Sequence, residues 1–302
     1  MIVRVGTRAS ALARAQTARV AAALGAQGVR CRILTIQTEG DLHPRTPTAA
    51  LGVGAFVKAL EVALAEGRID AAVHSAKDLP AQARDDLTLA AFLPRDDPRD
   101  VLVTRTGADL AGLPAGAVVG TDSPRRRAFL LATRPDLDVR GVRGNVDTRL
   151  RKLDAGHLDA LVLAAAGLAR LGLDGRATER LDPSVMLPAV GQGAIVVQTR
   201  TGSGPLADCL AAIDHAATRA AVTAERALLA ALGGGCRRPV ASLGECAGSR
   251  LYLDAAVLDP DGARIVRDRF EGDAARPEEA GRTLAQRLLG LGAGAILYEV
   301  AS

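Results

Sequence analysis

Apolar and polar positions alternate along residues 1–100 in a pattern that predicts strands and helices in turn. Short apolar runs are typical of buried strands, and apolar residues at helical spacing after Ser10 predict a capped amphipathic helix. A loop at residues 40–54 has no such period, and long loops of this kind are often functional. The predicted strands span residues 2–5, 32–37 and 71–73, and the predicted helices span residues 11–25 and 55–66.

The middle of the chain repeats this alternation. Ser123 and Asn145 stand where helix caps are expected, and Gly156 stands where a helix is expected to end. The βαβαβ order predicts a parallel sheet with right-handed crossovers. The strands are predicted at residues 101–104, 117–120, 137–141 and 158–164, and the helices at residues 124–133, 146–155 and up to 168.

The last part of the chain changes character after a connection rich in proline and glycine at residues 183–193. We expect the strand that follows it, residues 194–199, to return to the first sheet, so that two segments form a hinge. A strong turn signal at residues 259–262 then joins two strands of a small α+β domain. The elements predicted there are a helix at residues 218–232, strands at residues 238–245, 250–258 and 264–271, and a helix at residues 277–291.

Composition narrows the possible functions. The length of 302 residues predicts two or three domains. Aromatic residues make up only 2% of the chain, which argues against a stacking platform for single-stranded nucleic acid. The formal charge is only +4 and acidic residues are mixed throughout, so a small polyanionic ligand fits better than a nucleic-acid duplex.

The sequence lacks the patterns typical of a signal peptide, a membrane span or paired cysteines. The first residues are typical of a strand rather than a signal peptide, and no uncharged apolar run reaches the roughly 18 residues of a membrane span. The four cysteines are widely spaced without paired CxxC motifs, so no zinc or other metal site is expected. We expect a cytoplasmic protein with reduced thiols and no membrane or nucleic-acid partner.

Residues 70–80 carry the most informative cluster. The apolar strand at residues 71–73 breaks into a polar segment that contains Ser75, Lys77 and Asp78. Ligands bind at the carboxyl ends of strands in open α/β sheets, and Lys77 is one of only three lysines in an arginine-rich chain. A chemical role and an ordinary solvated ion pair both remain open at this point.

Arginines gather at three loop-to-helix junctions, residues 6–10, 120–127 and 143–149. A helix N-terminus offers unpaired N–H groups and a positive dipole end, and arginine adds bidentate recognition of carboxylate or phosphate. Because each junction follows a predicted strand, we expect the three to converge on one anion-binding cleft. Ordinary solvated arginines are the alternative.

Cys236 lies in a Gly-Gly-Gly-Cys-Arg-Arg-Pro segment. Adjacent arginines favour the reactive thiolate, whereas a buried structural cysteine after a helix end is an equally good interpretation. For Cys31, Cys209 and Cys246 a structural role is expected.

Taken together, these segments resemble the hydroxymethylbilane synthase family, also called porphobilinogen deaminases. The matching motifs occur in the family's order over essentially the whole length, at residues 6–10, 74–80, 95–100, 120–126, 143–149, 187–193 and 234–236. The resemblance implies two periplasmic-binding-protein-like α/β domains with a hinge, a small C-terminal α+β domain, and a monomer. The domains are expected at residues 1–96 with 194–214, at residues 99–190, and at residues 216–302.

The reaction implied by the resemblance joins four porphobilinogen molecules head to tail with release of ammonia and yields hydroxymethylbilane. The implied cofactor is dipyrromethane, held by a thioether to Cys236, and Asp78 matches the catalytic aspartate. The implied cofactor-binding residues are Cys236, Lys77, Ser75, Thr121, Ser123, Arg125, Arg126, Arg143 and Arg149. The implied substrate-binding residues are Arg8, Ser10, Arg143, Arg149, Arg170 and Gln192.

Two positions and one alternative qualify this resemblance. Asp122 stands where the family often has serine, and Phe56 lies where a mobile lid is implied after the loop at residues 42–54. A non-catalytic, two-lobed anion receptor would share the arginine-lined cleft. Such a receptor explains neither the Cys236 segment nor the Lys77-Asp78 pair.

Overall fold

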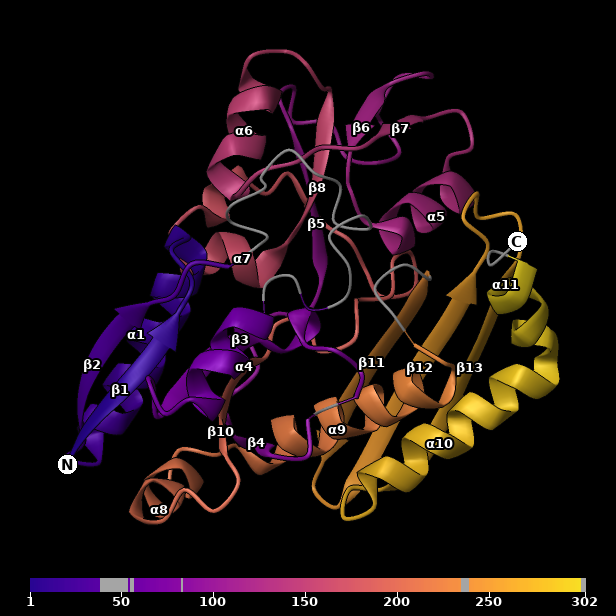
Figure 1. Ribbon diagram of the computed structural model, residues 1–302. Helices are drawn as coiled ribbons and strands as arrows, with labels where there is room; N and C mark the ends of the chain where they lie inside the picture. Colours follow the sequence, from indigo (N-terminus) through magenta and orange to yellow (C-terminus); the bar gives the residue numbers. More distant parts are fainter. Residues whose placement is uncertain (39–53, 55–56, 83, 235–238, 300–302) are drawn as a thin grey trace.

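The computed structural model describes residues 1–38, 54, 57–82, 84–234 and 239–299. Three units, each built on its own sheet, make up these residues (Figure 1). Cys236, Phe56 and nearly all of the loop at residues 42–54 lie outside the described residues. The predicted cofactor cysteine and the predicted lid therefore stay predictions.

The first lobe is a five-stranded sheet in the order β2-β1-β3-β10-β4. Apolar residues of α1 and α8 pack with the inner positions of its strands in one buried cluster. Its strands are β1 (Ile2–Thr7), β2 (Arg30–Thr35), β3 (Ala71–Ser75), β4 (Leu87–Phe92) and β10 (Ile195–Arg200). Its helices are α1 (Ala11–Ala26), α4 (Lys58–Ala65), the single 3₁₀ turn η1 (Ala76–Asp78) and α8 (Pro205–Ala211).

The second lobe repeats this plan with the strand order β7-β6-β8-β5-β9. Its strands are β5 (Asp100–Thr104), β6 (Val118–Gly120), β7 (Asp138–Arg140), β8 (Ala160–Ala164) and β9 (Glu179–Arg180). Its helices are α5 (Pro124–Thr133), α6 (Val146–Asp154), α7 (Ala165–Arg170) and the 3₁₀ turn η2 (Asp174–Arg176). Ser123 caps α5 with Pro124 at the first helical position, as the sequence predicts.

The two sheets are mixed rather than wholly parallel, which corrects the parallel sheet predicted for the second lobe. β10 is antiparallel to β3 and β4, and β5 is antiparallel to β8 and β9. Both strands enter from the opposite lobe instead of through a helical crossover within their own sheet, so the parallel rule does not apply to them. The predicted return of the chain to the first sheet is confirmed, and two segments join the lobes.

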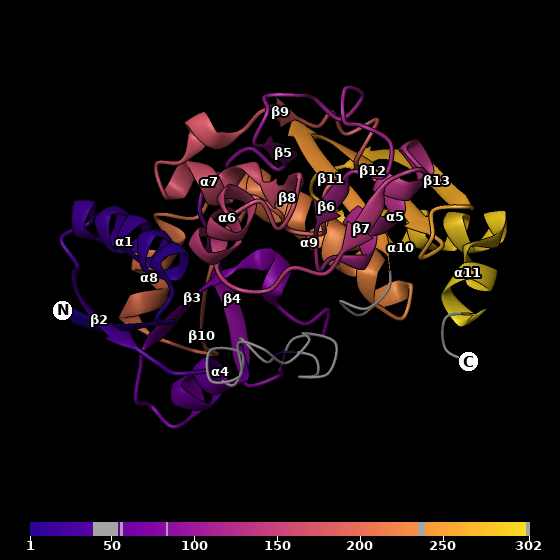
Figure 2. The same cartoon turned by 90° about the horizontal axis from the view of Figure 1, so that it is seen from above.

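The third unit is a three-stranded antiparallel sheet covered by two long helices. Its strands are β11 (Val240–Ala247), β12 (Arg250–Leu258) and β13 (Ile265–Asp273). Its helices are α9 (Ala216–Ala231), α10 (Pro277–Leu288), the π-helical turn η3 (Leu289–Ala293) and α11 (Gly294–Glu299). Figures 1 and 2 show this unit beside the second lobe, on the side away from β1 and β2.

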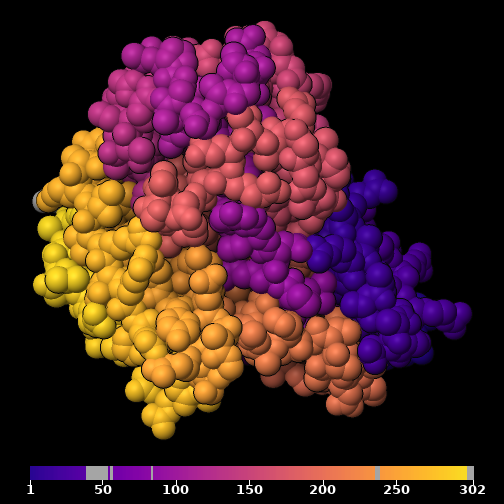
Figure 3. All heavy atoms as spheres, turned by 180° about the vertical axis from the view of Figure 1, so that it is seen from behind, coloured from indigo at the N-terminus to yellow at the C-terminus, as the bar shows by residue number. Residues whose placement is uncertain are grey.

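Apolar packing joins the third unit to both lobes. Leu243 and Leu258 of the third sheet belong to the same buried cluster as Leu102 and Leu130 of the second lobe. Val222 of α9 packs in a cluster that otherwise consists of first-lobe residues and Ala194 of the second joining segment. In the view from behind, the purple chain ahead of β5 lies between the pink second lobe and the orange third unit (Figure 3).

Two strands and two α-helices of the described residues were missed in the sequence. The missed elements are β4, β9, α8 and α11. β4 contains the pair Ala90-Ala91, and alanine has no preference for strands, while β9 has only two residues. The domain limits given above also stay predictions, because strand membership does not fix where the joining residues belong.

Candidate functional site

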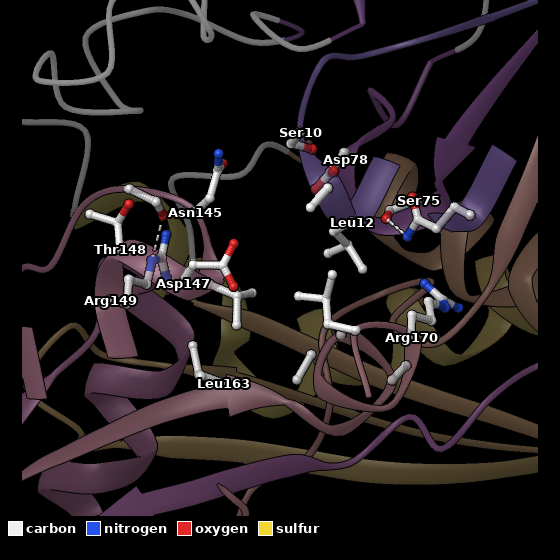
Figure 4. A pocket seen from close by; sticks show the side chains of 18 of the residues that line it. Ser10, Leu12, Ser75, Asp78, Asn145, Asp147, Thr148, Arg149, Leu163 and Arg170 are labelled. Carbon is white, nitrogen blue, oxygen red and sulfur yellow. Dashed lines mark hydrogen bonds between the residues drawn. The ribbon is translucent and has the colours of Figure 1, made fainter. Parts of the chain in front are cut away.

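A cleft of about 740 Å³ opens between the first two lobes. Its volume falls within the roughly 300–1,000 Å³ typical of small-molecule sites. Figure 4 shows Ser10, Ser75 and Asp78 of the first lobe across an open space from Asn145 and Thr148 of the second. The charged residues of the lining are Arg8, Lys77, Asp78, Arg126, Arg143, Asp147, Arg149, Lys152 and Arg170.

Strand ends position the first-lobe side of this cleft. β3 stops at Ser75, the turn η1 presents Lys77 and Asp78, and Pro80 prevents a regular continuation. Ser10 caps α1 by accepting a hydrogen bond from the Ala13 N–H at 3.3 Å. These residues follow the carboxyl ends of β3 and β1, which are parallel neighbours in the sheet, and this is where open α/β sheets bind ligands.

Gln16 is a cleft residue that the sequence reasoning missed. Its side chain is buried and donates a hydrogen bond from Nε2 to Ser75 Oγ at 2.6 Å. It shares the buried face of α1 with Ala13, Val20 and Leu24. A polar residue on an apolar helical stripe was the available signal, because such a residue is rarely buried without a partner.

Lys77 is partly buried where it lines the cleft. Its Nζ donates a hydrogen bond to Gln192 Oε1 at 3.2 Å. Burial, and then the positive charge of Arg126, lowers the pKa of Lys77 to about 8, although Asp78 and Asp100 oppose the shift. A lysine with such a pKa binds a carboxylate well at neutral pH and loses that capacity as the pH rises through 8.

A buried carboxylate, Asp100, organises the twin arginines at the start of α5. Arg125 Nη1 lies 2.7 Å from Asp100 Oδ2, and Arg126 Nη2 lies 2.8 Å from Oδ1. Burial alone would raise the pKa of Asp100, but the two guanidiniums outweigh it and hold the pKa of that carboxyl well below its usual range. Asp100 therefore stays ionised, and the two arginines are fixed in place.

The second-lobe arginines are also held by the protein. Arg143 Nη1 donates to Asp122 Oδ2 at 3.1 Å, and Arg149 Nε donates to the Gly144 carbonyl at 2.8 Å. Burial, and then the charge of Arg126, lowers the pKa of Arg149 to about 10. Its guanidinium therefore still carries a charge at neutral pH, and this charge would stabilise an anionic ligand bound beside it.

Arg170 sits at the point where the second joining segment meets the cleft. Its Nε donates to Asp96 Oδ2 at 2.8 Å, and its Nη2 donates to the Gly193 carbonyl at 2.6 Å. Gly193 has a φ of +87°, and a Cβ there would lie 2.4 Å from the Asp96 carbonyl oxygen. Only glycine allows the two joining segments to approach this closely.

The structure brings nine of the predicted site residues to the described lining and leaves four behind it. The nine are Arg8, Ser10, Ser75, Lys77, Asp78, Arg126, Arg143, Arg149 and Arg170. Thr121 accepts from the Ser123 N–H, Ser123 caps α5, and Arg125 donates to the Leu187 carbonyl. Gln192 is buried between Lys77 and Asp100.

Lys152 and Asp147 complete the charged lining without having been predicted. Lys152 Nζ donates to the Arg143 carbonyl at 3.2 Å, and Asp147 extends from the first turn of α6 (Figure 4). Among the described residues, no group of three His, Cys, Asp or Glu side chains could hold a metal ion. Within the same residues, every helix is too short or too polar to cross a membrane.

Solved structures offer only a distant likeness. The methionine-binding protein MetQ matches with a TM-score of 0.45 and 14% identity, covering 70% of this chain and 89% of that one. The periplasmic VFT2 domain of Bordetella pertussis BvgS matches with a TM-score of 0.42 and 18% identity, covering 70% of this chain and 86% of that one. The strand orders of the two lobes themselves confirm the predicted α/β fold class.

Sequence comparisons are far closer. The dipyrromethane cofactor-binding domain of porphobilinogen deaminase matches residues 3–208, and the C-terminal domain of the same enzyme matches residues 219–290. The porphobilinogen deaminase of Acidothermus cellulolyticus is 51% identical over 98% of this chain and 91% of its own length. That of Mycobacterium tuberculosis is 47% identical over 99% of both chains. The chain belongs to the porphobilinogen deaminase, or hydroxymethylbilane synthase, family.

Proposed function

We propose that the cleft between the two lobes is the active site of this porphobilinogen deaminase and that Asp78 is its catalytic carboxylate. The chain is a transferase of tetrapyrrole synthesis, which joins four porphobilinogen molecules head to tail and releases ammonia at each step. Family membership does not favour the non-catalytic receptor. The single observation that carries the proposal is a cleft whose described lining combines seven Lys and Arg side chains with Asp78.

The cationic lining fits the dipyrromethane cofactor of the family. Each pyrrole ring carries an acetate and a propionate, so a growing chain adds two carboxylates with each ring. A carboxylate taken out of water without a partner is costly, and guanidinium groups offer bidentate, charge-assisted hydrogen bonds. When bound, the cofactor supplies the free pyrrole position to which the first substrate is joined.

We assign the lining residues to the ligand carboxylates and the four residues behind them to positioning. Ser75, Lys77, Arg126, Arg143 and Arg149 would hold the cofactor. Arg8, Ser10 and Arg170, together with Arg143 and Arg149, would receive the substrate. Thr121, Ser123, Arg125 and Gln192 would act through these residues, and the support is their contacts with the start of α5 and with Lys77.

Asp78 would assist both the cleavage of the old bond and the formation of the new one. The aminomethyl C–N bond of porphobilinogen breaks, a C–C bond to the neighbouring pyrrole forms, and the displaced pyrrole proton leaves with ammonia as ammonium. A carboxylate can accept a hydrogen bond from the substrate ammonium, stabilise the cation left behind and take the pyrrole proton. Its neighbour Lys77 is already held by Gln192, so Asp78 is not needed to anchor it.

We propose Cys236 as the cofactor attachment site. Burial raises the pKa of the thiols of Cys31 and Cys246, which favours their unreactive protonated form. Cys236 instead has two arginines beside it in sequence, which favour the thiolate. The free thiols of Cys31, Cys209 and Cys246 suit a reducing compartment, so we also propose a cytoplasmic location.

Intact-mass measurement tests this function. We expect the purified protein to carry an adduct of two pyrrole units and to consume porphobilinogen. The variant Cys236→Ser should lack the adduct, whereas the matched control Cys246→Ser should keep it. An active protein without an adduct, or an adduct that survives in Cys236→Ser, would contradict the proposal. Light scattering checks the proposed monomer against the chain mass of 31.1 kDa.

A further inference from the structure

We propose that Asp100 is a positioning residue that fixes Arg126 and, through Gln192, Lys77 as one carboxylate-binding unit across the two lobes. The inference rests on the proposed function of the cleft. It concerns a residue that does not itself line the cleft and that is not among the site residues predicted from the sequence.

Asp100 has no solvent exposure, and three side chains surround its carboxylate. It begins β5, where the chain enters the second lobe. Its Oδ1 accepts hydrogen bonds from Arg126 Nε at 2.9 Å and from Gln192 Nε2 at 2.9 Å, and its Oδ2 lies 2.7 Å from Arg125 Nη1. A buried charge needs such partners, and this one has them from the second lobe and the joining segment.

Gln192 extends the network to the first lobe. Its Nε2 also donates to the Pro98 carbonyl at 2.8 Å, while its Oε1 accepts from Lys77 Nζ at 3.2 Å. Both ends of the amide are therefore in use, and they connect the two joining segments to Lys77. The result is one hydrogen-bonded path from the second-lobe arginines through Asp100 and Gln192 to the first-lobe lysine.

The network separates the roles of the twin arginines. Arg125 is tied to Asp100 and to the Leu187 carbonyl, away from the cleft. Arg126 lines the cleft and uses Nε and Nη2 on Asp100 and Nη1 on the Val162 carbonyl. Of its five N–H groups, two therefore remain to bind a ligand carboxylate. Asp100 both neutralises one positive charge and sets the direction of that guanidinium.

Removing the charge of Asp100 would leave two buried arginines and the partly buried Lys77 without that countercharge. Arg125, Arg126 and Lys77 would repel one another, so their side chains would lose the geometry that the ligand requires. We therefore expect Asp100→Asn to retain the fold's apolar core and to lose much of its hold on the cofactor.

Asp254 provides a matched control in the third unit. Its Oδ2 lies 2.7 Å from Arg267 Nη2 and 2.8 Å from Arg269 Nε, so it also holds two arginines. None of these three residues lines the cleft. Asp254→Asn therefore removes a comparable ion-pair cluster without touching the proposed unit.

The first measurement is the fraction of protein that carries the two-pyrrole adduct, and the rate at which the remainder gains it from porphobilinogen. For Asp100→Asn we expect that rate to fall about 10- to 100-fold, the range for losing hydrogen bonds to a charged group. Asp254→Asn should match the wild-type protein. Equal adduct gain by Asp100→Asn and the wild-type protein would overturn the inference.

The second measurement is the pH dependence of adduct gain, which a merely structural role would not move. Lys77 faces Arg126, Arg125, Asp78 and Asp100, and its pKa of about 8 predicts a decline in adduct gain as the pH rises through 8. Asp100 raises that pKa, so Asp100→Asn should move the decline to lower pH. An unmoved profile would contradict the inference.

If Asp100→Asn does not fold, the variant Gln192→Leu tests the inference in its place. It breaks the link to Lys77 and leaves both arginine contacts of Asp100, so we expect a roughly 3- to 10-fold slower adduct gain. An unchanged rate in a folded Gln192→Leu would overturn the inference. A wild-type protein without any adduct would overturn the proposed function as well, whereas wild-type adduct with unaffected variants would overturn the role of Asp100 alone.

Discussion

The two large contacts of the second lobe differ in their chemistry. Toward the first lobe it presents a polar cleft of about 740 Å³ lined by Arg126, Arg149 and other cations. Toward the third unit it presents an apolar face, where Leu243 and Leu258 join its own buried cluster. The turn after β12 approaches α5 so closely that a Cβ on Gly262 would lie 2.3 Å from the Ala128 carbonyl oxygen.

The cleft side of the second lobe is therefore suited to binding a ligand, whereas the side toward the third unit stabilises the fold. An apolar, close-packed contact is stable without a ligand and tolerates little change in shape. A cleft lined by like charges gains stability when an anion arrives, because the ligand supplies the missing countercharges. Substitutions on the cleft side should therefore change chemistry and binding, and substitutions on the third-unit side should change stability.

The largest effect is expected at the catalytic carboxylate. Asp78→Asn should keep the cofactor adduct and lower kcat about 100- to 10,000-fold, the usual range for removing a general acid–base group. Asp147→Asn is the control, because it neutralises another carboxylate of the same lining. Steady-state rates and intact mass check both variants, and near-normal turnover by Asp78→Asn would remove this mechanism.

The apolar contact should respond in stability instead. Gly262 has a φ of +76°, so Gly262→Ala adds both backbone strain and a clash with α5. We expect the free energy of unfolding to fall by about 2–3 kcal/mol, measured by denaturant titration, with kcat per folded molecule unchanged. Gly248→Ala, at φ +60° in open space, should cost only about 1 kcal/mol. If both variants lost the same free energy of unfolding, the close approach of Gly262 to α5 would contribute nothing to stability.

A smaller effect is expected from a cleft arginine whose charge is kept. Arg149→Lys retains the positive charge and loses the planar fork and the bond from Nε to the Gly144 carbonyl. We expect the KM for porphobilinogen to rise about tenfold with less change in kcat. Arg151→Lys, on the same helix but outside the described lining, should behave like the wild-type protein. A similar KM in both variants would argue against ligand contact by Arg149.

The smallest effect is expected at Asp122, which accepts a hydrogen bond from Arg143. Asp122→Ser removes a negative charge beside an anion site, so the KM should fall about two- to fivefold at low ionic strength and approach the wild-type value at high salt. Asp138→Ser removes an exposed partner of Arg140 away from the cleft and should leave the KM unchanged. A rise in the KM of Asp122→Ser would show that Asp122 instead helps to position Arg143.

The sequence predicted the cleft better than it predicted how the cleft is held together. Strand-end motifs led directly to Lys77, Asp78 and Arg149, because strand ends and helix starts have local signatures. The partnership of Asp100 with Gln192 joins residues 92 positions apart, and no local pattern indicates it. The antiparallel entry of β5 and β10 was missed for the same reason, since it depends on the chain passing between lobes.

A crystal structure of the protein reconstituted with porphobilinogen tests the central claim most directly. We predict electron density for pyrrole rings in the cleft between the first two lobes, with ring carboxylates within hydrogen-bonding distance of Arg126, Arg149 and Lys77 and a ring beside Asp78. Density at any other place, in protein whose mass includes the two-pyrrole adduct, would contradict it.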